Sequence, residues 1–84
     1  MKKSDKISTE QKELMVRLGK TIKQLRKDQK KSYELLAQEM GLPRNTYFAI
    51  EAGRLDFQFS SLCQILLFYK QKHNITPEKI FKDL

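Results

Sequence analysis

The sequence is poor in the residues that disulfides, metal sites and catalytic centres require. Cys63 and His73 are the only cysteine and the only histidine in the chain, so it has neither an internal disulfide nor a set of zinc ligands. We find no paired nucleophile and base, no phosphate-binding loop and no metal-binding cluster. These absences predict a protein that is not an enzyme and that uses no metal and no cofactor.

Long apolar runs are also missing. No apolar stretch approaches the roughly 18 residues that a membrane-spanning helix needs, and the basic N-terminus is not followed by the apolar core of a signal peptide. We therefore expect the protein to be cytoplasmic. Residues 1–7, MKKSDKI, are expected to form a flexible basic tail, which is either simply solvated or reaches for phosphates.

Proline and glycine are scarce, and strand-like alternation is almost absent. The chain has two prolines and three glycines among 84 residues, a pattern that favours an all-α bundle over a β fold. A chain of this length makes one small domain whose core is near the lower limit of size. We assign residues 8–84 to that single domain.

Positive charge clearly exceeds negative charge. Seventeen Lys/Arg against ten Asp/Glu give a formal net charge of +7, which favours a polyanionic partner. The excess is concentrated in residues 1–31, with eleven basic and four acidic residues. Charge alone fits DNA, RNA or an anionic membrane equally well, so the partner has to be argued from motifs.

The stretch from Tyr33 to Gly53 has the pattern of two short helices joined by a tight turn. Gly41 stands where a helix ends in a left-handed residue, and Pro43 suits the first turn of a second helix over about residues 43–52. Apolar residues recur at helical spacing, at Leu36, Ala37, Met40, Tyr47 and Ile50. In a helix-turn-helix, the second helix enters the major groove of DNA.

This stretch resembles the helix-turn-helix of the Cro/CI phage repressor family, also called the XRE family. The residues that carry the resemblance are Leu25, Arg26, Ser32, Glu34, Leu36, Ala37, Met40, Gly41, Leu42, Ile50, Glu51 and Gly53. The resemblance covers about residues 14–84. It implies a lambda-repressor-like fold, a compact bundle of five helices with the helix-turn-helix in helices 2 and 3. The alternative is an ordinary helical hairpin with a glycine turn.

Further helices are predicted on both sides of this motif. The first covers about residues 8–28 and the fourth about residues 58–72. Thr76 is expected to cap a short last helix that begins at Pro77. The predicted inward face of the fourth helix consists of Phe59, Leu62, Ile65, Leu66 and Tyr69.

The C-terminal third has more apolar residues than these inward faces need. A helix that is apolar nearly all round should be buried all round, and so short a chain has little mass to cover it. We therefore predict a homodimer. The predicted dimer interface consists of Cys63, Leu67, Phe68, Phe81 and Leu84. Ordinary packing of the fifth helix against this surface is the competing explanation.

Five residues of the predicted second helix of the motif remain for the groove side. They are Arg44, Asn45, Thr46, Phe48 and Ala49. An arginine can bind guanine O6 and N7 with two hydrogen bonds, and an asparagine can bind adenine N6 and N7 likewise. Thr46 can reach a phosphate or a base edge, and Phe48 or Ala49 can meet a thymine methyl group.

Contacts to the DNA backbone are predicted at Lys23, Lys27, Lys31, Ser32, Tyr33 and Arg54. Relatives usually carry a glutamine in place of Tyr33, which touches a phosphate and braces the reading helix; a tyrosine can donate its hydroxyl but lacks the two donors of an amide. The resemblance also implies that Arg26 pairs with Glu51 and clamps this helix to the first. Two independent surface charges are the alternative. Apolar and acidic residues follow Arg54 where relatives are basic or polar, so fewer phosphate contacts are expected there.

These features predict a sequence-specific, double-stranded DNA-binding transcriptional regulator that acts as a homodimer on a near-palindromic operator. The alternative is a protein-interaction module, such as the antitoxin half of a toxin-antitoxin pair, whose fourth helix would hold a protein partner. RNA binding fits less well, because the sequence lacks the exposed aromatic platform that such proteins use.

Overall fold

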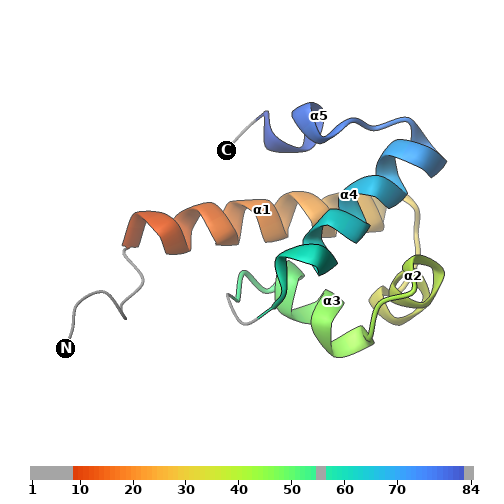
Figure 1. Ribbon diagram of the computed structural model, residues 1–84, viewed down its shortest axis with the longest axis horizontal. Coiled ribbons are helices and arrows are strands. Elements are labelled where there is room, and N and C mark those ends of the chain that lie inside the picture. The colour runs from red at the N-terminus through yellow and green to blue at the C-terminus, as the bar shows by residue number, and fades with distance from the viewer. Residues whose placement is uncertain (1–8, 55–56, 83–84) are drawn as a thin grey trace.

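The computed structural model of the protein describes residues 9–54 and 57–82. Within these ranges it has no strand and five helices: α1 (Thr9–Asp28), α2 (Tyr33–Met40), α3 (Arg44–Glu51), α4 (Phe59–His73) and α5 (Pro77–Phe81). Figure 1 shows α1 running along the molecule, with α2 and α3 on one side, α5 on the other and α4 crossing it. The predicted all-α fold with five helices is confirmed. The predicted tail, residues 1–7, lies outside the described residues.

The turn between α2 and α3 has the geometry that its sequence predicts. Gly41 ends α2 in the left-handed conformation, with a φ of 76°, and the Leu42 nitrogen donates to the Ala37 carbonyl at 2.9 Å. The Ser32 hydroxyl caps α2 by accepting a hydrogen bond from the backbone of its first turn at 3.2 Å. α3 follows Pro43, whose side chain gives no cap bond. The helix-turn-helix is therefore present, with α3 one residue shorter at each end than expected.

Gly19 allows α3 to approach α1 closely. A Cβ at this position would lie 2.5 Å from the backbone oxygens of both Ile50 and Glu51, at the end of α3. Side chains do not come so near to backbone atoms, so the two helices cross here because the residue is glycine. A glycine inside a helix costs up to about 1 kcal/mol relative to alanine. In α1 this loss of helix stability is what allows α3 to pack so closely against it.

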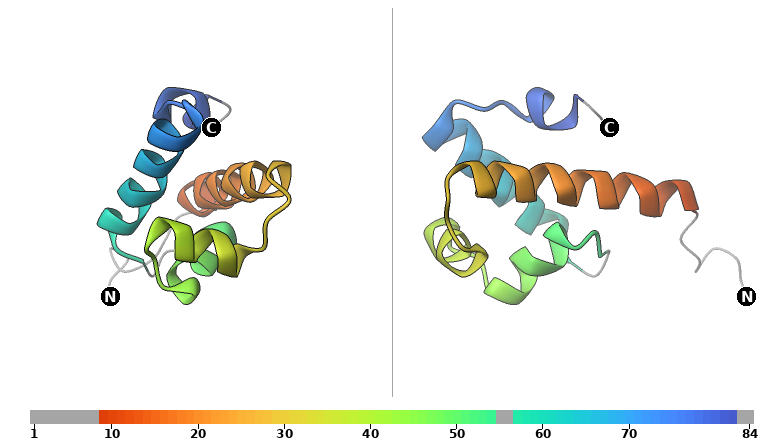
Figure 2. Two further views of the ribbon diagram at one scale, coloured as in Figure 1. Left: turned by 90° about the vertical axis from the view of Figure 1, so that its right-hand side faces the viewer. Right: turned by 180° about the vertical axis from the view of Figure 1, so that it is seen from behind.

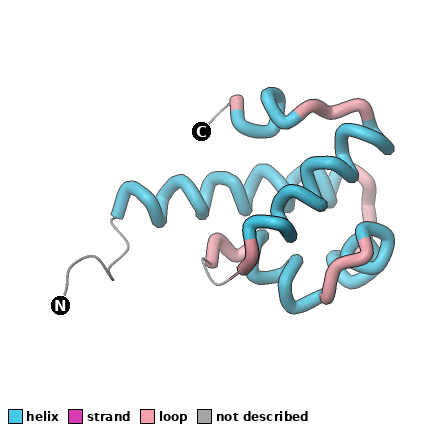
Figure 3. The backbone as a smooth tube through the Cα atoms, viewed as in Figure 1, coloured by secondary structure: helices cyan, strands magenta, loops and turns pink. Residues whose placement is uncertain are grey.

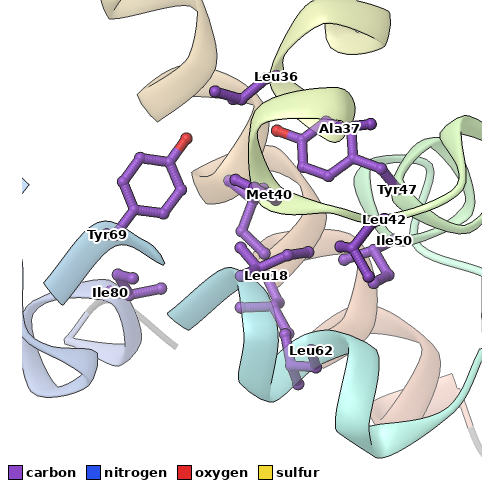
Figure 4. Close-up of a cluster of buried hydrophobic side chains, with 12 residues drawn as sticks. Leu18, Leu36, Ala37, Met40, Leu42, Tyr47, Ile50, Leu62, Tyr69 and Ile80 are labelled. Carbon is purple, nitrogen blue, oxygen red and sulfur yellow. The ribbon is translucent and has the colours of Figure 1, made fainter. Parts of the chain in front are cut away.

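The core lies where the helices face one another (Figure 4). Its buried members are Leu18, Ile22, Leu36, Ala37, Met40, Leu42, Tyr47, Ile50, Leu62, Ile65, Tyr69 and Ile80. Ile80 is 2% exposed and is the one residue of α5 that is buried in this core. Full burial of such a side chain stabilises a fold by about 1.5–3 kcal/mol, so Ile80 anchors α5 to the bundle.

α4 turns a narrower face to the core than its sequence suggested. Leu62, Ile65 and Tyr69 are buried as expected, and Leu66 is partly buried against them. Phe59, also expected inward, is 74% exposed. That expectation is wrong because Phe59 is the first residue of α4, directly after a loop (Figure 3), and its side chain turns away from the core. None of the described helices is long and apolar enough to cross a membrane.

Candidate nucleic-acid interface

α3 turns a polar face to the solvent and an apolar face to the core. Arg44 and Asn45, in its first turn, are exposed, and Thr46 is half-buried. Phe48, one turn further along, is 47% exposed, whereas Tyr47 on the opposite face is fully buried. Four of the five residues predicted to contact bases therefore lie at the surface of one helix.

Ala49 is the exception among the predicted base contacts. It is 5% exposed, because the chain turns back over it after α3, where the Arg54 nitrogen donates to the Ala49 carbonyl at 2.9 Å. The groove-side placement inferred from helical spacing is therefore corrected: Ala49 is buried. Arg54 is exposed, and a hollow of about 330 Å³ on this face is lined by Asn45, Thr46, Phe48, Ala49 and Arg54.

The start of α2 meets the exposed face of α3 through two aromatic rings. The ring centroids of Tyr33 and Phe48 lie 5.4 Å apart, with their planes inclined at 45°, within the range of favourable aromatic pairs. Packing of the two rings thus braces α2 against α3. The glutamine that relatives carry in place of Tyr33 would brace the helices through hydrogen bonds instead. Tyr33 is half-buried by this contact.

Arg26 of α1 and Glu51 of α3 form the ion pair that the sequence resemblance implies. Arg26 Nε donates to one carboxylate oxygen of Glu51 at 2.7 Å, and Nη2 donates to the other at 3.1 Å. Nη1 donates to the backbone oxygen of Lys31 at 3.0 Å. The two side chains are 14% and 5% exposed, and the hydrogen bond to Glu51 raises the pKa of Arg26. One guanidinium therefore joins α1, the loop before α2 and the end of α3.

A polar layer of two tyrosines and a glutamine lies in the core, and the sequence pattern did not reveal it. Gln29 Nε2 donates to the Tyr69 hydroxyl at 3.1 Å and to the Leu25 carbonyl at 3.2 Å. Burial raises the pKa of Tyr69 to about 12. Burial also raises the pKa of Tyr47, and the nearby carboxylate of Glu51 raises it further. Helical spacing places both tyrosines inward. Because a buried phenol usually has a polar partner, the sequence could have indicated that a polar residue such as Gln29 lies next to one of them.

The predicted backbone contacts lie along α1, at the start of α2 and after α3. Lys23, Lys27 and Ser32 are exposed. Lys31 differs from them, because its Nζ donates to both carboxylate oxygens of Glu39, at 2.8 and 3.0 Å. The sequence did not indicate this pairing, which engages Lys31 within the protein.

A comparison with protein families matches residues 22–74 of the chain to a helix-turn-helix family. The match takes in all of α2, α3 and α4 and covers more than half of the sequence. The chain belongs to the Cro/CI-type (XRE) helix-turn-helix family. Membership implies DNA as the partner and regulation of transcription as the role, and the family is not enzymatic. Comparisons with curated proteins and with solved structures gave no match.

Two parts of this Cro/CI-type domain lie outside the matched residues. The first 13 of the 20 residues of α1 precede residue 22, and α5 follows residue 74. In the part of the chain that the structure describes, no three His, Cys, Asp or Glu side chains come together as a metal site.

The residues predicted for a dimer interface of the Cro/CI-type domain differ in exposure. Leu67 and Phe81 are 52% and 38% exposed. Cys63 and Phe68 are half-buried, and the Phe68 ring packs edge-on against a core tyrosine with centroids 5.4 Å apart. Phe68 is therefore partly a core residue, and Leu84 lies outside the described residues.

Proposed function

We propose that this domain is a sequence-specific regulator of transcription that binds double-stranded DNA as a homodimer, with α3 in the major groove. The fixed orientation of α3 carries the proposal. Its inner face is buried, the Arg26–Glu51 ion pair ties its end to α1, and its first turn exposes Arg44 and Asn45. Hydrogen bonds to base edges depend on short distances and good angles, so a reading helix has to be held rigidly.

The exposed side chains of α3 offer different chemistry to base edges. The guanidinium of Arg44 suits guanine O6 and N7, and the amide of Asn45 suits adenine N6 and N7. Thr46 serves a phosphate or a base edge, and Phe48 gives an apolar contact to a thymine methyl group. The proposed backbone contacts are Lys23, Lys27, Ser32, Tyr33 and Arg54; Lys31 is left out because it is engaged by Glu39.

An apolar line on α4 supports the homodimer. Phe59, Cys63 and Leu67 follow one another at intervals of four residues and thus share one side of the helix; we call them the outer face of α4. Phe59 and Leu67 are 74% and 52% exposed. Residues 59–69 contain no charged side chain, although each chain carries a net charge of +7. Two copies that repel elsewhere can therefore meet on this uncharged face.

A two-fold symmetric dimer has direct consequences for the DNA site. Its two copies of α3 enter successive major grooves about one turn, or roughly 34 Å, apart. The operator is then near-palindromic, because each half-site meets an identical reading helix. A regulator of this kind acts where the DNA is, inside the cell.

A protein-interaction module is the second candidate, and the outer face of α4 is the observation that favours it. A different protein, such as the toxin of a toxin-antitoxin pair, would then cover Phe59 and Leu67. The oligomeric state of the purified chain separates the two candidates. A homodimer covers the outer face by itself, whereas a domain built for another partner stays monomeric until that partner is added.

Selection of bound duplexes from a random DNA pool tests the proposed function directly. The purified chain should enrich one near-palindromic sequence whose half-site centres are about one helical turn apart. Enrichment of an asymmetric site would contradict the symmetric dimer. Retention of the pool without any sequence preference would contradict base reading by α3.

A further inference from the structure

A line of lysines runs along α1, next to the residues that touch the end of α3. The Cα of Val16 lies 3.0 Å from the point that a Cβ on Gly53 would occupy, and Gly19 meets the last carbonyls of α3. Four lysines of α1 are each three or four residues away from Val16, from Gly19 or from another of the four. They therefore lie on the same side of α1 as Val16 and Gly19. We call them the lysine stripe: Lys12, Lys20, Lys23 and Lys27.

The lysine stripe lies on the side of α1 away from the core. Leu18 and Ile22 lie on one side of the row formed by Val16 and Gly19 and are buried. All four lysines are exposed. The left view of Figure 2 shows α1 and its connection to α2 on the side of the molecule opposite α4. Tyr33, the first residue of α2, packs on the exposed face of α3. The side of α1 that carries the stripe meets the end of α3, so the stripe and Tyr33 both lie beside the reading helix.

The charge of the lysine stripe is not neutralised within the described residues. The ion pairs there join Arg26 to Glu51 and Lys31 to Glu39, and none includes a lysine of the stripe. A hollow of about 410 Å³ at the N-terminal end of the stripe is lined by Thr9, Lys12, Glu13, Val16, Arg17 and Lys20. Three basic side chains outweigh one carboxylate around it, so the hollow favours an anion.

The lysine stripe is also longer than a DNA groove is wide. The fifteen residue steps from Lys12 to Lys27 rise by about 22 Å at 1.5 Å per residue, whereas the major groove is about 12 Å wide. Lys12 and Lys27 therefore lie farther apart along α1 than one groove is wide, so the stripe can reach backbone outside the groove that α3 enters. After Arg54 the next basic residue is Lys70, so the segment that follows α3 offers few other groups to this stretch of backbone.

We propose that Lys12 and Lys20, in the part of α1 that precedes the matched residues, bind phosphates of the DNA that flanks each half-site. This proposal rests on the proposed DNA binding and extends its contact surface. It enlarges the phosphate footprint without adding any base contact. Affinity should therefore depend on the length of the flanking duplex, while the preferred operator sequence should not.

The test compares two double variants of equal charge change. Lys12→Ala with Lys20→Ala removes the proposed contacts, and Lys70→Ala with Lys72→Ala removes two exposed lysines of α4. Each protein is titrated at two salt concentrations with the selected operator, trimmed to its ends or extended by about ten base pairs on each side. On the extended duplex, loss of two phosphate contacts should weaken binding by on the order of tenfold and reduce the salt slope by about 1.8. On the trimmed duplex, the Lys12/Lys20 variant should match the α4 control.

Two outcomes separate the proposal from the function on which it rests. If the two double variants bind the extended duplex with equal affinity and equal salt slope, the proposed flank contacts are overturned. The proposed function stands in that case as long as the wild-type protein binds the operator. A wild-type protein that binds neither duplex overturns both. Circular dichroism of each variant checks that the helical structure is intact. The double variant Lys12→Arg with Lys20→Arg keeps the charge and should bind like the wild type, which would show that lost affinity reflects lost charge.

Discussion

Arg26 and Glu51, 25 positions apart in the sequence, meet through two hydrogen bonds of 2.7 and 3.1 Å between one guanidinium and one carboxylate. The third bond of the guanidinium, to the backbone of Lys31, adds the loop before α2 to the same junction. A bidentate pair has one favoured geometry, so the direction of α3 is set by charge as well as by packing. The view from behind in Figure 2 shows the end of α3 lying under α1.

Removal of one partner of this pair should destabilise the fold more than removal of a surface charge. Glu51→Ala leaves Arg26 mostly buried and unpaired, which should cost about 3 kcal/mol of unfolding free energy. The double variant with Arg26→Ala should cost clearly less than the sum of the two single changes. Chemical denaturation of the four proteins gives the coupling energy.

The ion pair between Lys31 and Glu39 is the matched control for that cycle. Its side chains are 32% and 35% exposed, so water screens them and the coupling should stay below about 1 kcal/mol. Additive effects of Arg26→Ala and Glu51→Ala would mean that the two residues are not coupled in solution.

Gly19→Ala should destabilise the protein although alanine is the better helix former. The new methyl group would meet two backbone oxygens at 2.5 Å, and the overpacking should cost about 1–3 kcal/mol, more than the up to 1 kcal/mol gained in helix propensity. The exposed residue Glu13 on the same helix is the control, and Glu13→Ala should change stability by no more than about 0.5 kcal/mol. Thermal melts that show Gly19→Ala to be stabilising would refute the close crossing of α1 and α3.

Two substitutions of Tyr33 separate its ring from its hydroxyl. Tyr33→Phe keeps the contact with Phe48 and should leave the melting temperature unchanged, while DNA binding weakens by about 0.5–1.5 kcal/mol through loss of one phosphate hydrogen bond. Tyr33→Ala should also lose about 0.5–1.5 kcal/mol of stability with the aromatic pair. Wild-type DNA affinity in Tyr33→Phe would remove this hydroxyl from the backbone contacts.

Disruption of the outer face of α4 should produce monomers. Sedimentation at micromolar concentration should give about twice the chain mass of 10.0 kDa for the wild type, and Leu67→Lys should give the single mass, because a charge cannot be buried unpaired in an apolar contact. Leu35→Lys is the matched control, since Leu35 is similarly exposed, at 44%, but belongs to α2. A monomeric wild type, or dimers in both variants, would place the dimer contact elsewhere or remove it.

Local signals in the sequence predicted most of the fold. The glycine that ends α2, the serine that caps it and the apolar spacing of the helices each act within a few residues, so the sequence alone is enough to recognise them. The Arg26–Glu51 pair came from the family resemblance. Nothing in the spacing of two residues 25 positions apart indicates that they touch.

The errors arose where contacts between distant segments decide the outcome. Ala49 falls on the groove side by helical spacing, but the turn after α3 covers it. Phe59 fits the apolar period of α4, yet a helix that is apolar on several sides gives no signal about which side is covered. The pairing of Lys31 with Glu39 and the role of Gly19 depend in the same way on where neighbouring elements lie.

The central claim is that α3 reads base edges, and the response of Arg44→Ala on two duplexes tests it most directly. Wild-type and variant proteins are titrated with the selected operator and with a scrambled duplex of equal length, at one salt concentration. Loss of a bidentate contact to one base pair should cost about 1–3 kcal/mol on the operator and leave affinity for the scrambled duplex nearly unchanged. An equal loss on both duplexes would show that Arg44 holds a phosphate, and would contradict base reading by this residue.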